Sequence, residues 1–431
     1  MQLDEYLSKM TEQIRYRKIR PQIRDEFEKH ILDQQEQFLR NGMDQKDALK
    51  MAILEMGDPV RVGAMLDRIH RPKMDWRLLG LVGILSVLGV IVQQVLEDGG
   101  QVNGALLWMS GVDLSRICLV AVGVGVMLLL CMLDHSFLSK RGWLLYGIFS
   151  GITAGHHLFG RSVNGGLGAS VLWMYLYIPL YAGVLHQCAK RGGRKRMFLA
   201  AAAIAVPWLI GEIGSGMSLV IRMNLLVIQL LMLSVVLYQK GTRSCVCFIS
   251  ISWCVGLGTA CLKFVLHPYM RHRFQAFFAH GGSMDAGQSR VREILSLAFL
   301  RDQPVLNGSA YGNVTSDYVV TGLLQKAGCL PVILLLVILV FFFIKLVDII
   351  RRQKSQLGTL IALGCTLVFL IQTVEYLLMN FGVLPGMFGT LPFLSAGGHT
   401  TLLMYVLAGI LLSTYRFQDV TTDYNNVTLV P

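Results

Sequence analysis

The feature that most constrains this chain is a series of ten apolar runs, most of them about as long as a bilayer is thick. They fall near residues 77–96, 117–133, 143–160, 167–187, 197–212, 217–238, 244–265, 327–349, 357–378 and 397–415. A helix needs about 20 mainly apolar residues to cross the hydrocarbon core. Helices are favoured there because they satisfy their own backbone groups. The sequence therefore predicts an all-α, polytopic membrane protein of about ten transmembrane helices.

The charges between these runs predict the orientation. Basic residues gather in alternate short connections, as at Lys140 and Arg141 and again over 190–196, whereas the opposite connections carry only Arg116 and Arg161. Because basic loops stay in the cytoplasm, both termini are expected on the cytoplasmic side of the membrane, with the long connection 266–318 outside. The whole net charge of +12 lies after residue 76. It is a topology signal, and no nucleic-acid partner is predicted.

A small helical domain is predicted ahead of the first span. Residues 1–73 carry short amphipathic patterns, with Gly42 ending one helix and Asp44 capping the next. The segment from Glu26 to Pro72, with MGDP at 56–59, resembles the permease prefix domain of bacterial membrane proteins. The resemblance implies a cytoplasmic regulatory or assembly module; a solvated bundle without a ligand is the alternative. The remaining divisions are a membrane domain over 77–415 and a cytoplasmic tail over 416–431.

Two features inside the membrane domain call for a function. The stretch GTLPFLSAGGHTTLLMY at 389–405 should break a helix within hydrocarbon, which is tolerated only where protein or a water-filled cavity surrounds the break. Arg222 and Glu375 lie inside predicted spans, where a charge needs a partner and indicates function. Mutual pairing and the lining of a lipid-headgroup cavity are both open for them.

The chain resembles the SEDS family of shape, elongation, division and sporulation proteins. The stretch YLLMNFGVLPGMFGTLPFLSAGGHTTLL, 376–403, is similar to the family's C-terminal signature, which contains G-L-L-P and L-P-F-[IV]-S-Y-G-G. A second stretch, YGNVTSDYVVTGLLQKAG at 311–328, places Asp317 on the family's catalytic Asp. The family's fold, ten spans in the bacterial plasma membrane with both termini in the cytoplasm, agrees with the count above.

The resemblance implies a peptidoglycan glycosyltransferase that polymerises Lipid II, together with a class B penicillin-binding-protein transpeptidase as partner. Asp317 would be the general base. The substrate-binding candidates are Arg273, Lys326, Ser395, Gly397 and Gly398, because cations and exposed amides suit a lipid pyrophosphate. No His, Cys or Glu cluster has metal-ligand spacing, so no metal site or cofactor is predicted, although a divalent cation could accompany the pyrophosphate.

The chain also departs from the family pattern, and the departures keep other functions open. The family's Q-P-S-E is replaced by WMYL at 173–176, its paired acids by Gln325 and Lys326, and an Asn by Tyr376. Lys326 could pair with Asp317 and weaken it as a base. Two alternatives follow: a catalytically degenerate scaffold of a division or sporulation complex, and a transporter or flippase of a lipid-linked precursor.

Overall fold

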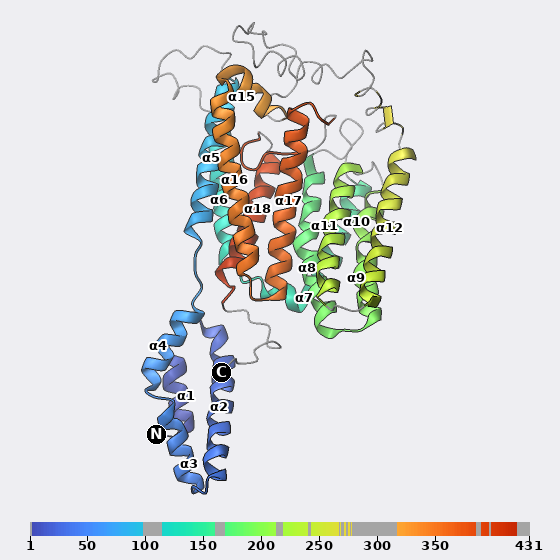
Figure 1. The fold of residues 1–431 in the computed structure, drawn as a ribbon. Helices are drawn as coiled ribbons and strands as arrows, with labels where there is room; N and C mark the ends of the chain where they lie inside the picture. The colour runs from blue at the N-terminus through green and yellow to red at the C-terminus, as the bar shows by residue number, and fades with distance from the viewer. Residues whose placement is uncertain are drawn as a thin grey trace, which may run out of the picture. The chain divides into compact units, whose positions relative to one another are not determined.

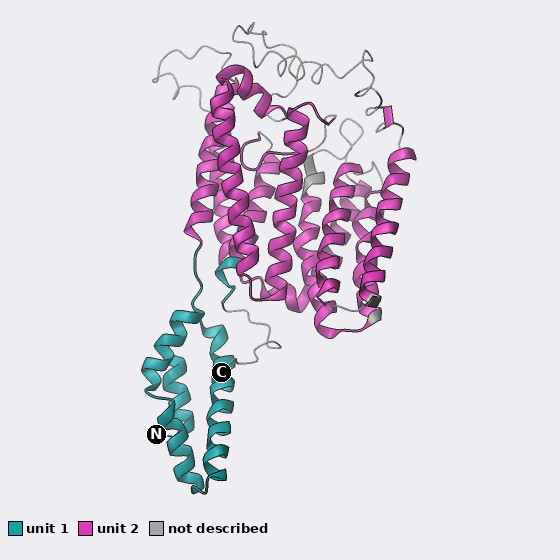
Figure 2. Ribbon diagram, viewed as in Figure 1, with its two compact units in different colours: residues 1–74, 415–431 teal, residues 75–414 magenta. Residues whose placement is uncertain are grey.

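The computed structural model describes residues 2–97, 114–159, 169–212, 219–239, 243–266, 317–384, 389–395 and 398–419, together with 268, 271–272, 275 and 277. The chain forms two compact units (Figures 1 and 2). The first contains residues 1–74 and 415–431, and the second contains residues 75–414. All regular structure in the described residues is helical, as the sequence predicts.

The head, residues 2–74, is a small helical bundle. Its helices are α1 (Leu3–Glu12), η1 (Arg17–Ile19), α2 (Arg20–Arg40), α3 (Gln45–Glu55) and α4 (Pro59–His70). The Asp44 carboxylate accepts the amide of Lys46 and so caps α3, as predicted. Asp58 caps α4 in the same way, with Pro59 at the first helical position. Local sequence signals therefore set the starts of both helices.

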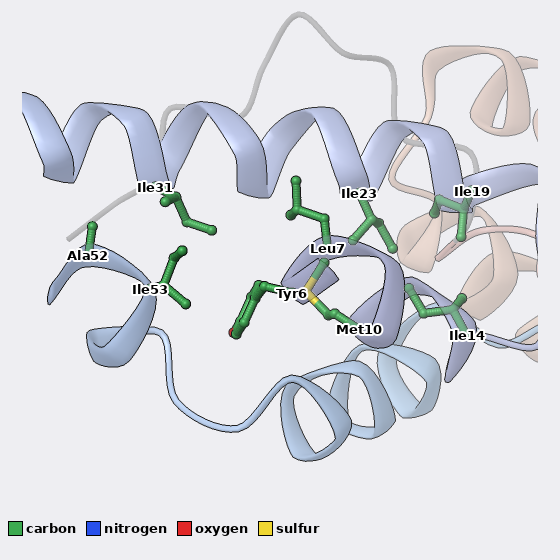
Figure 3. Packing of buried hydrophobic residues seen from close by; sticks show 9 residues of the cluster. All are labelled: Tyr6, Leu7, Met10, Ile14, Ile19, Ile23, Ile31, Ala52 and Ile53. Carbon is green, nitrogen blue, oxygen red and sulfur yellow. The ribbon is translucent and has the colours of Figure 1, made fainter. Parts of the chain in front are cut away.

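One apolar cluster holds the head together (Figure 3). It consists of Tyr6, Leu7, Met10, Ile14, Ile19, Ile23, Ile31, Ala52 and Ile53. Helices α1 and α4 approach closely at Gly63, where an added Cβ would lie 2.2 Å from the Met10 carbonyl oxygen. The segment that follows the last helix joins this unit, since Lys73 and Asp419 form an ion pair of 2.9 Å. The Tyr16 and Phe417 rings also pack, with centroids 5.9 Å apart.

The membrane domain is a helical bundle. Its helices are α5 (Trp76–Glu97), α6 (Leu114–Met132), α7 (Ser136–Phe159), η3 (Ala169–Leu176), α8 (Tyr177–Arg191), α9 (Arg194–Ala203), α10 (Ala205–Ile210), α11 (Leu219–Tyr238), α12 (Arg243–Leu266), α15 (Val319–Ala327), α16 (Cys329–Arg352), α17 (Gln356–Asn380) and α18 (Gly398–Arg416). Every predicted run coincides with a helix or with two consecutive ones. The chain is therefore a multi-pass membrane protein.

Seven helices in the described part of the chain are long and apolar enough to cross a membrane: α5, α6, α11, α12, α16, α17 and α18. The other three predicted runs correspond to α7, to η3 with α8, and to α9 with α10. The run 197–212 is divided because the ring of Pro207 clashes with the carbonyl four residues earlier, at Ala203, where α9 ends. Hydropathy alone does not register such a break.

The long connection 266–318 lies mostly outside the described residues. Its last part is described, and it leads into α15, a short helix that packs against α5, α16 and α17 at one end of the bundle (Figure 1). This end carries Asp317 and is where the candidate site is built.

Candidate functional site

Asp317 lies immediately before α15, and the C-terminal end of α17 fixes its backbone. The side chain of Asp317 is exposed. Its carbonyl oxygen accepts a hydrogen bond of 3.1 Å from the side-chain amide of Asn380. Asn380 itself is fully buried. The carboxylate is thus presented outward from an anchored backbone position, which is what a group acting on a bound substrate requires.

Two side chains of α17 also satisfy the first amides of α15. The hydroxyl of Tyr376 accepts from the Val319 amide at 2.9 Å. The carbonyl oxygen of the Asn380 side chain accepts from the Thr321 amide at 3.2 Å. The first amides of any helix lack partners within that helix, so side chains must supply them. Sequence reasoning missed Asn380 altogether and noted Tyr376 only as a departure from the family pattern.

The other end of α15 is held by Lys326. Its ammonium donates to the backbone oxygens of Val95 and Leu96, at 3.1 and 2.7 Å. These carbonyls belong to the last turn of α5, where a cation is favourable because the carbonyls lack helical partners and carry the negative end of the helix dipole. Lys326 therefore ties α15 to α5. The pairing of Lys326 with Asp317 and its contact with substrate remain predictions.

The break predicted around residues 389–405 is a compact turn. Over 391–395 the chain leaves helical geometry, and Phe393 has a positive φ of 64°. The hydroxyl oxygen of Ser395 accepts from the Leu391 amide at 3.0 Å and closes the turn. Gln93 of α5 donates to the Leu394 carbonyl at 2.6 Å. The broken backbone is thus satisfied by protein groups, as burial requires.

Aromatic packing and one glycine hold this turn in the bundle. The Phe393 ring lies 5.0 Å from that of Tyr405 and 6.1 Å from those of Phe342 and Phe369. On the other side α5 presents Gly89, where an added Cβ would meet the Phe393 carbonyl oxygen at 2.2 Å. The sequence predicted a substrate role for Ser395, which is buried in this turn. Gly397 lies outside the described residues, and Gly398 begins α18 with an exposed backbone.

A chain of buried and half-buried polar side chains runs beside the turn. Asn224 of α11 donates to the Glu375 carboxylate at 2.9 Å and to the Tyr175 hydroxyl at 3.1 Å. Gln372 also donates to that hydroxyl, and Thr390 donates to the Gln372 carbonyl oxygen at 3.3 Å. Tyr175 lies within WMYL, the stretch that replaces the family's Q-P-S-E. The network joins α11, η3 and α17 to the segment entering the turn.

The two intramembrane charges have separate partners. Arg222 forms an ion pair with Glu212, while Glu375 accepts from Asn224. The alternative of mutual pairing between Arg222 and Glu375 was therefore wrong, because the two side chains leave α11 and α17 toward different neighbours. Arg273, the remaining predicted substrate-binding residue, lies outside the described residues. Within the described ranges no three His, Cys, Asp or Glu side chains come together as metal ligands.

Comparison with known proteins shows which family this part of the chain is similar to. Residues 306–419, which contain Asp317, α15, α17 and the turn, match the FtsW/RodA/SpoVE family model, described as cell cycle protein. A putative peptidoglycan glycosyltransferase FtsW of Mesostigma viride is 28% identical over 97 residues. That alignment covers 22% of this chain and 23% of the relative.

Two solved structures share the fold. One is a chain from a study of how a peptidoglycan synthase complex coordinates polymerization and crosslinking, with a TM-score of 0.57 and 20% identity, covering 80% of this chain and 98% of the other. The other is the rod shape determining protein RodA of Thermus thermophilus, with a TM-score of 0.50 and 19% identity. It covers 81% of this chain and 98% of that protein.

Proposed function

We propose that this chain, a divergent member of the SEDS family of FtsW, RodA and SpoVE cell cycle proteins, polymerises a lipid-linked peptidoglycan precursor with Asp317 as its general base. The more general role, that of a membrane protein in cell-wall synthesis, follows from the family. The observation that carries the finer proposal is the anchoring of Asp317, whose carbonyl is bonded to Asn380 while the next helix is bonded to Tyr376.

The reaction assigns a task to each part of this end of the bundle. A sugar hydroxyl of the acceptor attacks the anomeric carbon of the donor, and undecaprenyl pyrophosphate leaves. The exposed carboxylate of Asp317 takes the proton from that hydroxyl as the new bond forms. Cations stabilise the charge that builds up on the pyrophosphate, and Arg273 is the candidate for this task. Lys326 donates to backbone oxygens of α5, so its contribution would be to position α15.

The central experiment is Lipid II polymerisation by the full chain in lipid nanodiscs, with and without a class B penicillin-binding-protein transpeptidase. Asp317→Asn keeps the shape of the side chain and removes its basicity, so the rate should fall by roughly 10²–10⁴, as for other lost general bases. Glu36→Gln, an exposed acid of the head, is the matched control and should leave the rate unchanged. Asp317→Asn at the wild-type rate would refute the assignment.

Tyr376→Phe tests the anchoring. It removes the hydroxyl that accepts the Val319 amide, while the ring stays in place. Asp317 should then spend less time in its productive position, so kcat should fall while KM for the lipid substrate stays near its wild-type value. A rise in KM alone would assign Tyr376 to substrate binding.

A second function, that of a non-catalytic scaffold, is favoured by one observation. Lys326, which stands where the family has an acid, is bonded to the end of α5. If the chain is a scaffold, wild type will not polymerise Lipid II even beside its transpeptidase, and Asp317→Asn will fully complement a deletion.

The proposed membrane orientation, with both termini in the cytoplasm, can be tested separately. Cysteines placed at Ser283 and Gly193 test it, since an impermeant reagent added to intact cells should label only the first.

A further inference from the structure

Three ionised side chains meet at the ends of α10, α11 and α12. Glu212, which follows the end of α10, pairs with Arg222 near the start of α11. The same carboxylate oxygen lies 3.1 Å from the ammonium of Lys263, near the end of α12. The Arg222 guanidinium also stands over the Trp208 ring, 5.5 Å from its centroid. We call these four residues the rim cluster.

The rim cluster has an excess of positive charge. One carboxylate faces two cations, so the three groups together carry a charge of +1. The side chain of Arg222 is only 6% exposed, and its Nε has no hydrogen-bond partner within the described part of the chain. A buried donor without a partner costs free energy, and an excess of positive charge at a partly buried site attracts an anion. Both features point to an anion that completes the cluster.

The neighbouring sequence does not supply that anion. The connection 213–218, IGSGMS, has no charged residue. After α12 the next acid along the chain is Asp285, and Arg271 and Arg273 come before it. The segments adjoining the cluster therefore add positive charge or none, and the missing anion is best sought among molecules that bind from outside.

The cluster is open toward the lipid side of the bundle. Helices α10, α11 and α12 lie together at one edge, away from α5 and α16 (Figure 1). Only 11% of the apolar stretch of α12 is buried, so most of that helix faces outward. The side chains of Lys263 and Glu212 are 43% and 39% exposed, and the exposed apolar residues Leu262 and Leu266 flank Lys263. A ligand that reaches the cluster would lie along an apolar wall.

The depth of the cluster fits a lipid headgroup. Arg222 follows the start of α11 by one turn, and Lys263 precedes the end of α12 by one turn. Asn224, two residues beyond Arg222, donates to Glu375 of α17. Glu375 lies near the C-terminal end of α17, and that end of the helix is bonded to Asp317. The rim cluster is thus at the Asp317 end of the bundle, and Trp208 is of the residue type that gathers at membrane interfaces.

We propose that the rim cluster binds the phosphate group of a membrane lipid, with Arg222 Nε and Lys263 Nζ as its donors. A guanidinium and an ammonium make strong charge-assisted bonds to phosphate oxygens, and a lipid tail would cover the outward face of α12. The phosphate could come from a bulk phospholipid or from a lipid-linked pyrophosphate, because both present the same anionic oxygens. The proposal does not rest on the polymerase activity.

Native mass spectrometry of the full, delipidated chain in detergent tests the site, with three lipid probes added separately. Phosphatidylglycerol and undecaprenyl pyrophosphate are the anionic probes, and phosphatidylcholine is the zwitterionic control. Lys263→Gln should weaken binding of one anionic lipid by about tenfold or more, the usual value of a hydrogen bond to a charged group. Glu212→Gln raises the charge of the cluster by one and should strengthen the same binding. Arg351→Gln, an exposed cation at the end of α16, is the matched control and should change neither.

The opposite signs of the two variants separate a lipid site from a purely structural ion cluster. If the cluster only joins the three helices, both variants will lower the thermal midpoint and neither will change lipid binding, which would overturn the proposal. Binding of both anionic lipids would identify a general headgroup site, and binding of the pyrophosphate alone a site for lipid-linked sugars. Asp317→Asn should bind like wild type, so loss of catalysis and loss of this site give different results.

Discussion

Replacing Gly89 by alanine tests whether the turn over 391–395 is a rigid part of the bundle. An added Cβ on Gly89 would lie 2.2 Å from the Phe393 carbonyl oxygen and 3.3 Å from the Cα of Leu394. Non-bonded heavy atoms prefer separations of about 3.5–4.0 Å. Either α5 or the turn must therefore move by about 1 Å to accept a single methyl group.

The surroundings allow little movement. Phe393 is packed against three aromatic rings, Leu394 is bonded to Gln93 of α5, and the Ser395 hydroxyl closes the turn. Overpacking of this kind costs about 1–3 kcal/mol, and a site bounded by backbone belongs at the upper end. Alanine recovers about 1 kcal/mol through its better helix propensity. The net loss of stability for Gly89→Ala is then about 2 kcal/mol.

The matched control lies on the same helix. An added Cβ on Gly83 meets no atom within 4 Å, so Gly83→Ala receives only the gain in propensity, up to about 1 kcal/mol. Thermal unfolding of the purified full chain in detergent should rank Gly83→Ala at or above wild type and Gly89→Ala below it. Polymerisation activity should fall with Gly89→Ala if the turn shapes the site. Equal midpoints for the two variants would refute the rigid-turn argument.

Three further predictions concern other parts of the chain. Lys326→Glu sets a carboxylate against the last carbonyls of α5 and should lower the thermal midpoint more than Lys326→Gln; an equal effect would show that the negative end of the α5 dipole does not act on this side chain. In the head, Gly63→Ala brings a Cβ to 2.2 Å from the Met10 carbonyl oxygen and should loosen α4 from α1, seen as faster amide exchange over 59–70, whereas Gly80→Ala in open space should not. Burial lowers the pKa of His135 to about 4 from an ordinary value of 6.5, against the raising effect of Asp134. The unfolded chain therefore binds the proton first, and stability is full above about pH 6.5 and falls toward pH 4. His135→Gln should flatten that pH dependence in thermal unfolding, and an unchanged slope would count against it.

The sequence predicted the fold well because the bilayer reduces the choice of structures. Apolar length decides a span, so all ten runs correspond to helical segments. The details that it missed are breaks within runs. Pro207 divides one run into α9 and α10, and the run that begins at 167 enters as η3 before continuing as α8. A proline or a change of helix type hardly alters mean hydropathy, so a count of apolar residues passes over it.

The site was only partly predictable, because its contacts join residues far apart in the chain. Asp317 and Ser395 were predicted from motifs, whereas Tyr376 and Asn380 bond to α15 across about sixty residues, which no motif indicates. Arg222 and Glu375 were singled out as costly charges, with pairing between them as one alternative, and the structure gives each a different partner. Glu212 is the partner of Arg222 and is the last residue of the predicted run 197–212, where sequence reasoning did not single it out.

Two departures from the family pattern, Tyr376 and Lys326, hold α15, one at each end. Tyr376, in the place of an Asn, accepts the first amide of α15, and Lys326, in the place of an acid, is bonded to the end of α5. Neither change leaves a buried group without a partner. These substitutions therefore keep the helix that follows Asp317 in position. A chain that had kept only a scaffold role would have no need to fix the backbone of an exposed Asp317 in this way, and this is the physical reason for placing catalysis ahead of the scaffold.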